Sequence, residues 1–188
     1  MDAVCGVLEQ LLYKLNVKLR TTRQRRKQQE PSVVIIDSQS VKTTAGTSEQ
    51  TGYDANKKVK GRKRHIAVDT QGNVMAAGIT AASVHDKPGA LSIEEQVEDL
   101  GGVKKIMADG AYKGIPPFTV HGRIEWEIVE KKERNCFKVL PKRWIVERTL
   151  AWLSNFRRLS KDYEKSITMS KAMILMSSIV ITLNKLCT

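Results

Sequence analysis

The chain has 188 residues, a length that allows one domain with a sizeable core and leaves little room for a second. Hydrophobic residues make up 41% of it and charged residues 28%, a balance that excludes an intrinsically disordered chain. Its 32 Lys and Arg residues outnumber its 20 Asp and Glu residues, and the resulting net charge of +12 favours a polyanionic partner, most often nucleic acid.

Residues 1–30 are predicted to form a basic N-terminal helical segment. Apolar residues recur at helical spacing from Val4 to Leu19, and basic residues follow from Arg20 to Lys27. The basic stretch is equally consistent with a solvated helix end and with a contact to a DNA backbone. We expect this segment to be the remnant of a longer N-terminal region, with the main domain spanning residues 31–188.

Two strand-like segments follow. The β-branched run Val33 to Ile36 predicts a buried strand that ends at Asp37. Residues 57–69 and 74–80, separated by the turn signal Gln71-Gly72-Asn73, predict a β-hairpin. Its first strand carries six basic residues that we expect to contact DNA phosphates, with a merely solvated strand edge as the alternative: Lys57, Lys58, Lys60, Arg62, Lys63 and Arg64.

The remaining segments complete an alternating pattern. We expect a short acidic helix over 93–100, a second buried strand over 103–108, a further strand over 124–129, and helices over 142–159 and 169–186. The last of these suits a core helix better than a membrane span. This order predicts an α/β fold, an RNase H-like mixed sheet flanked by helices.

Both buried strands are predicted to end in a carboxylate, at Asp37 and Asp109. A carboxylate beside a buried strand loses hydration unless something compensates, and a Mg²⁺ or Mn²⁺ ion would do so. Each Asp taken alone is better explained as the cap of a turn, which for Asp109 is the turn at Gly110. The 3.6-residue period places Glu147 on a polar helix face with Arg143 and Arg158, and this face suits DNA phosphates.

Four blocks of the sequence resemble those of the IS5-type bacterial insertion-sequence transposases. The resemblance covers residues 31–164, and the blocks occur in the family's order. They are Ile35-Ile36-Asp37-Ser38-Gln39-Ser40-Val41-Lys42, Lys60-Gly61-Arg62-Lys63-Arg64-His65, Ala108-Asp109-Gly110-Ala111-Tyr112 and Arg143-Trp144-Ile145-Val146-Glu147-Arg148-Thr149.

The resemblance implies a DDE catalytic domain over 31–188, in which Asp37, Asp109 and Glu147 are catalytic and hold two Mg²⁺ or Mn²⁺ ions. It implies a transposase that cuts DNA at the ends of an insertion sequence and joins them to target DNA. Its partners would be these DNAs and further copies of the chain. Arg143 matches the Arg of the family's Tyr-Arg-Glu-Lys signature, whereas Leu140 and Ser154 replace its Tyr and Lys.

Two other functions remain open: a catalytically idle DNA-binding fragment that regulates a full-length transposase, and an RNase H-like nuclease outside transposition. Only the transposase would join 3′ ends to a target. We expect Asp86 to lie near the site, and we assign none of the histidines His65, His85 and His121 to a metal. The three tryptophans, Trp126, Trp144 and Trp152, are predicted to be core residues.

The cellular location is predicted from what the sequence lacks. The three cysteines are far apart and form no C-x-x-C pair, so no disulfide framework or thiolate zinc site is expected. No secretory leader pattern opens the chain, and no uninterrupted apolar run approaches the length that spans a bilayer. We expect a cytoplasmic, nucleoid-associated protein with no membrane partner.

Overall fold

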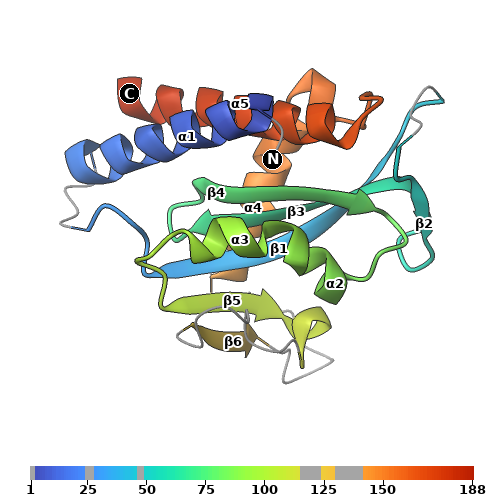
Figure 1. Cartoon of the computed structure of the whole chain (residues 1–188), viewed down its shortest axis with the longest axis horizontal. Coiled ribbons are helices and arrows are strands. Elements are labelled where there is room, and N and C mark those ends of the chain that lie inside the picture. The colour runs from blue at the N-terminus through green and yellow to red at the C-terminus, as the bar shows by residue number, and fades with distance from the viewer. Residues whose placement is uncertain (1–2, 24–27, 46–48, 115–123, 130–141) are drawn as a thin grey trace.

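A computed structural model describes residues 3–23, 28–45, 49–114, 124–129 and 142–188 of the chain (Figure 1). Its centre is a six-stranded sheet formed by β1 (Val33–Lys42), β2 (Gly52–Asp54), β3 (Val59–Asp69), β4 (Val74–Ala81), β5 (Lys105–Asp109) and β6 (Glu125–Val129). Antiparallel pairs join β3 to β1, β2 and β4, and parallel pairs join β5 to β1 and β6. This meander followed by parallel strands is the predicted RNase H-like mixed sheet.

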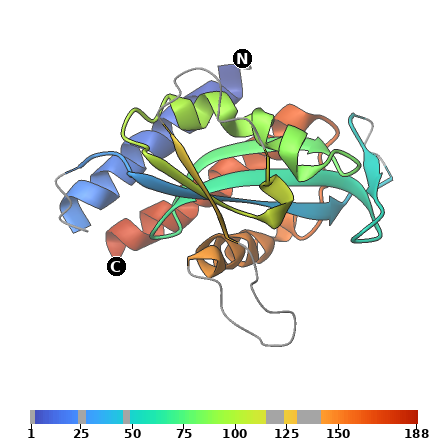
Figure 2. The ribbon, with the colours of Figure 1, turned by 90° about the horizontal axis from the view of Figure 1, so that it is seen from below.

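Helices cover both faces of the sheet. One face packs against α1 (Ala3–Lys18), α4 (Arg143–Ser154) and α5 (Ile167–Cys187), and the other against α2 (Asp86–Ala90), η2 (Leu91–Ile93) and α3 (Glu94–Glu98). Figure 2 shows α3 and α4 on opposite sides of the sheet. Because side chains alternate along a strand, Ile35 joins the first core and its neighbours Val34 and Ile36 join the second.

The helix α5 lies parallel to α1 on the same face of the sheet (Figure 1). The Cys5 thiol donates to the carbonyl of Thr168 near the start of both helices, and the Thr182 hydroxyl donates to Asn16 near their ends. By length and composition alone α5 could cross a membrane, although its apolar residues are interrupted by polar ones such as Lys171. Its face with Ile174 and Leu175 is nevertheless packed in the core, as predicted.

The predicted helix boundaries were less accurate than the predicted order. The acidic helix expected over 93–100 is the shorter α3, and α2 and η2, which precede it, were not predicted. The helix expected over 142–159 ends at Ser154, before the short turn η4 (Arg157–Leu159). A π-helical turn, η1 (Leu19–Arg23), ends α1. The short turn η3 (Gly110–Tyr112) follows β5 directly.

The turn between β3 and β4 holds α4 in place. The Thr149 hydroxyl donates to the carbonyl of Gly72, and Arg148 donates to that of Gln71. Gly72 has a left-handed φ of +79°, and a Cβ there would stand 2.8 Å from the Thr149 hydroxyl oxygen. These two constraints act on the same position, so the turn requires glycine.

We therefore expect Gly72→Ala to lower the free energy of unfolding by about 1–3 kcal/mol, through backbone strain and the displaced helix. Urea unfolding measures this effect. Gly110→Ala is the matched control, since a Cβ at Gly110 meets no atom within 4 Å. Equal midpoints for the two variants would contradict the role given to this turn.

Candidate active site

Asp37 and Asp109 lie on neighbouring parallel strands. The register pairs Ile35 of β1 with Met107 of β5, and the same offset brings Asp37 level with Asp109. Asp109 ends β5, as predicted. Asp37 was also predicted to end its strand, but β1 continues beyond it and stays paired with β3 through Lys42. On the β5 side, the pairing of β1 with this parallel neighbour stops at Ile35, two residues before Asp37.

Glu147 reaches the same place from α4. The buried side of this helix carries Ile145, Val146 and Leu153, so Glu147 points away from the core and is half exposed. Arg143 lies one turn before it. A single guanidinium nitrogen of Arg143 is 3.8 Å from an Asp37 oxygen, 3.5 Å from an Asp109 oxygen and 3.4 Å from a Glu147 oxygen. Three carboxylates that are distant in sequence thus surround one positive charge.

Each Asp uses its other oxygen to hold its own backbone. The Ser38 N–H donates to Asp37 Oδ1 at 2.7 Å, and the Ala111 N–H donates to Asp109 Oδ1 at 2.9 Å. For Asp109 this is the turn cap that the sequence suggested. Capping and a second role are therefore compatible, because the opposite oxygen of each carboxylate faces Arg143.

Burial dominates the electrostatics of Asp37. Desolvation raises the pKa of Asp37 to about 6, against the opposing effects of the Ser38 N–H and of the cations Arg143 and Lys57. At neutral pH the carboxylate is thus held ionised in a place that disfavours its charge. Such a group gains more from a bound cation than a solvated carboxylate does.

The donor set suits a hard divalent cation, since it consists of carboxylate oxygens next to a desolvated site. Within the described part of the chain, however, no group of three or more His, Cys, Asp or Glu side chains is arranged to hold a metal ion. The Arg143 guanidinium lies among the three carboxylates and supplies the positive charge there. The chemistry of the residues fits a metal site, and their present spacing is that of a carboxylate cluster around an arginine.

A buried polar network supports Asp37 from the opposite face of β1. The hydroxyl of Ser38 donates to Asp86 at 2.6 Å, and Lys63 donates to the same Asp86 oxygen at 3.0 Å. Asp86 was expected near the site, whereas Ser38 and Lys63 were not singled out for this contact. The period of two along β1 could have indicated Ser38, because it places that side chain opposite Asp37.

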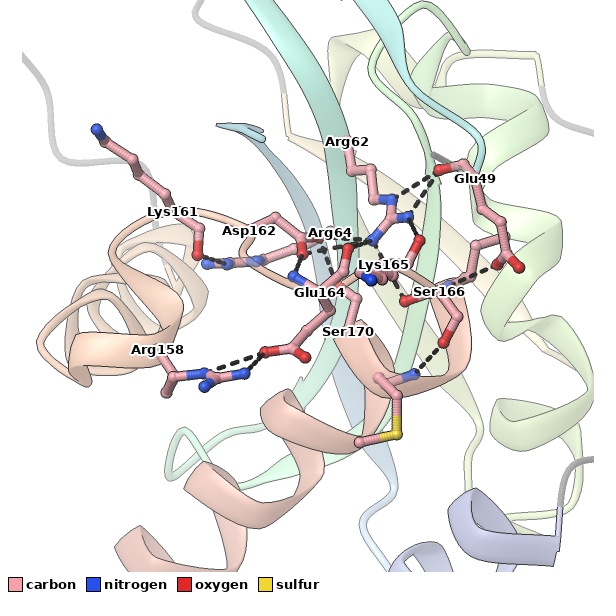
Figure 3. Close-up of polar contacts among 12 residues, drawn as sticks. Glu49, Arg62, Arg64, Arg158, Lys161, Asp162, Glu164, Lys165, Ser166 and Ser170 are labelled. Carbon is pink, nitrogen blue, oxygen red and sulfur yellow. Dashed lines mark hydrogen bonds and ion pairs between the residues drawn. The ribbon is translucent and has the colours of Figure 1, made fainter. Parts of the chain in front are cut away.

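Three of the six basic residues predicted to contact DNA do not face solvent, which corrects that prediction. Arg62, Lys63 and Arg64 are buried on β3. Figure 3 shows the Arg62 guanidinium among the backbone carbonyls of Glu49, Glu164, Lys165 and Ser166, to which it donates, beside the carboxylate of Asp162. Arg64 donates to the carbonyls of Leu159 and Lys161.

Packing on both faces of the sheet explains why a basic run is buried here. Because helices cover both faces of the sheet, neither set of alternating side chains on β3 faces solvent. The positive charges of these side chains are compensated inside the protein by backbone carbonyls and Asp residues. The other three predicted residues of the run, Lys57, Lys58 and Lys60, are exposed. Arg158 is also exposed, and it forms an ion pair with Glu164.

The tryptophans are less buried than predicted. Trp144 is 45% exposed, which corrects its assignment to the core, and Trp126 and Trp152 are partly buried. The Arg148 guanidinium lies 4.6 Å from the ring centre of Trp144 and 4.5 Å from that of Trp152. The aromatic residues of α4 therefore sandwich a cation on the helix surface.

Sequence comparison relates this chain to known proteins. A family model described as the transposase DDE domain matches residues 28–183. A protein of Burkholderia cepacia, named as a transposase for insertion sequence element IS402, is 29% identical over 140 residues. The alignment covers 67% of this chain and 64% of that relative, so the chain spans less than two thirds of the relative's length.

Two solved structures are similar at low scores. The catalytic core domain of BIV integrase is 14% identical, with 78% of this chain and 82% of that chain covered and a TM-score of 0.44. The Mos1 strand transfer complex is 9% identical, with 94% and 59% covered and a TM-score of 0.29.

Proposed function

The chain belongs to the transposase DDE domain family, and on that premise we propose that it cuts DNA and joins the cut ends to a target, using Asp37, Asp109 and Glu147. The observation that carries this proposal is the convergence of the three carboxylates on one nitrogen of Arg143. Cutting and joining both displace an oxygen from a phosphodiester. One site can therefore perform both.

The three carboxylates would hold two Mg²⁺ or Mn²⁺ ions. Such ions activate the attacking oxygen and stabilise the leaving oxygen in an in-line displacement. The chain's own contribution is to supply negative charge at fixed positions, with Asp37 and Asp109 oriented by their backbone N–H contacts. The Ser38 to Asp86 hydrogen bond ties the strand beside Asp37 to the start of α2.

Arg143 is proposed to exchange partners when DNA binds. A guanidinium that contacts carboxylates can contact phosphate oxygens with the same fork of N–H donors. If the guanidinium moved toward a phosphate, the three carboxylates would become available to bind the cations. The helix α4 allows this, because Arg143 belongs to its first turn and is partly exposed.

Lys57, Lys58, Lys60 and Arg158 are proposed to contact the DNA backbone together with Arg143. Lys57 is the best supported of the lysines, because the buried Asp54 accepts hydrogen bonds from the backbone N–H groups of Asn56 and Lys57 and so shapes their turn. Lys57 also lies near enough to oppose the rise in the pKa of Asp37 caused by burial. These positions suit phosphates close to the carboxylates.

We further propose that element ends and target DNA are the partners, that copies of the chain assemble on DNA, and that the protein is cytoplasmic and nucleoid-associated. Residues 31–188 would form the catalytic domain, with 1–30 as a helical segment attached to it. The regulatory, catalytically idle alternative is favoured by one observation. Ser154, at the signature's Lys position, has no charge and is bonded to Gln39 and to the carbonyl of Leu150.

A strand-transfer assay tests the proposal. The substrate is a duplex carrying the inverted repeat that flanks the coding sequence, with a supercoiled plasmid as target. We expect nicked and joined products with Mg²⁺ or Mn²⁺, and none after chelation by EDTA. Binding without any cleavage would favour the idle fragment, and cleavage without joining would favour a nuclease outside transposition.

A further inference from the structure

The segment between α4 and α5, residues 155–166, separates its charges by burial. Its four basic side chains, Arg157, Arg158, Lys161 and Lys165, are all exposed. Its two acidic residues, Asp162 and Glu164, are both buried. We call residues 155–166 the basic connector. Although its sequence mixes both signs, the surface that it presents is positive.

The buried arginines of β3 produce this separation (Figure 3). Arg62 pairs with Asp162, whose carboxylate also accepts from the Ser170 hydroxyl, so the acid is neutralised inside. Glu164 is turned toward Arg158 at the base of the connector. Arg62 and Arg64 together bind five backbone carbonyls of the connector, those of Leu159, Lys161, Glu164, Lys165 and Ser166. The connector is therefore held rigidly, with its basic side chains facing solvent.

The exposed side of the basic connector is hollowed as well as positively charged. A hollow of about 500 Å³ is lined by Arg157, Arg158 and Tyr163. Tyr163 is 41% exposed, and its hydroxyl lies 3.3 Å from that of Ser160. Basic groups beside an exposed aromatic hydroxyl are a frequent combination at nucleic-acid backbones.

The connector lies in line with the carboxylates along β1. Arg143 contacts Asp37, Gln39 contacts Ser154, and Asp162 donates its N–H to the carbonyl of Lys42. Thr43 forms a β-bridge with Asp162 of the connector. Six residues of extended chain separate Asp37 from Thr43, so the connector meets β1 about 20 Å from Asp37, at roughly 3.3 Å per residue. On B-DNA this corresponds to about six base pairs.

We propose that the basic connector binds the phosphate backbone of the DNA whose reacting phosphate lies at Asp37, about six base pairs from that phosphate. This inference rests on the proposed function, which already includes Arg158, and extends it to the other exposed basic side chains of the connector. Arg62 and Arg64 act as positioning residues that shape the surface, and Arg157, Lys161 and Lys165 make the contact. The basic strand thus serves DNA binding indirectly.

The test compares two triple variants with equal loss of charge. Arg157→Gln/Lys161→Gln/Lys165→Gln removes the connector's outward charges, and Lys14→Gln/Lys18→Gln/Lys104→Gln removes three exposed charges elsewhere. Affinity for the inverted-repeat duplex is measured in Ca²⁺ over a range of salt concentrations. We expect the connector variant to reduce the slope of log K against log salt by about 2.7, at about 0.9 per contact, and the control to keep the wild-type slope.

Ethylation interference then locates the contact. Phosphates about six base pairs from the cleaved bond should interfere with binding of the wild type and of the control variant, but not of the connector variant. Equal slopes for the two triple variants, or loss of binding to anionic lipid vesicles without loss of binding to the duplex, would overturn the proposal. Binding is measured without turnover, so failure of the cleavage assay would reject the proposed catalysis while leaving this result independent.

Discussion

Asp37→Asn is expected to reduce the rate of DNA cleavage by about a thousandfold at saturating DNA, and Asp109→Asn and Glu147→Gln by similar factors. Each change keeps the shape of the side chain and removes a negative charge that would hold a cation at the reacting phosphate. A loss of roughly 4 kcal/mol of transition-state stabilisation corresponds to this factor. Single-turnover cleavage of the inverted-repeat duplex in Mg²⁺ measures it.

Asp99→Asn provides the matched control, because it removes the same charge from an exposed position on the opposite face of the sheet. Its cleavage rate should equal that of the wild type. Duplex affinity in Ca²⁺ should be retained by all four variants, which separates chemistry from binding. If Asp37→Asn cleaves within a few-fold of Asp99→Asn, Asp37 has no part in the reaction.

The same substitution also has an expected effect on stability. Because the pKa of Asp37 in the folded protein, about 6, lies above its ordinary value of 3.8, the folded state favours the protonated form. The stabilisation of the folded state by protonated Asp37 is complete below about pH 4 and is lost as the pH rises through 6. Without metal, Asp37→Asn should therefore melt no lower than the wild type at pH 7, and its advantage should vanish at pH 4.

Arg62→Met is expected to lower the free energy of unfolding by about 3–5 kcal/mol. The substitution leaves Asp162 as a buried, unpaired carboxylate and removes the donor from four backbone carbonyls. Because whole domains are stable by only about 5–15 kcal/mol, such a loss endangers folding itself. Urea unfolding followed by circular dichroism measures the change.

Lys60→Met is the control, since it removes an exposed charge two residues away on the same strand. It should change stability by less than about 0.5 kcal/mol. The double variant Arg62→Met/Asp162→Asn should be less destabilised than the two single losses together, because the orphaned charge is gone. A small effect of Arg62→Met would mean that the basic connector is not held by β3.

Much of the architecture could be predicted from residue patterns. The β-branched run before Asp37, the second apolar run before Asp109 and the turn at Gly72 determine β1, β5 and the β3 to β4 hairpin locally. Propensity and period act over a few residues, so they are readable in the sequence. The alignment of Asp37 with Asp109 also follows from the parallel pairing of two strands that carry an Asp near the same level.

Other features depend on distant parts of the chain. The basic run on β3 has the pattern of a solvated strand. Arg62 and Arg64 are buried there by the basic connector, about 100 residues later in sequence, and Lys63 by the segment that carries Val84 and Asp86. Trp144 has the large aromatic side chain of a typical core residue, yet α4 is rotated so that Ile145 and Val146 fill the core instead. Nothing in the local sequence states which residues compete for the same space.

The sequence by itself determined the order of the elements, the mixed sheet and the three acidic side chains with their family resemblance, because these depend on local pattern and residue identity. Only the tertiary structure decided that Arg143 lies among the three carboxylates and that Arg62 and Arg64 face inward. The reason is physical: burial and ion pairing are set by what packs against a side chain, and these neighbours come from remote segments.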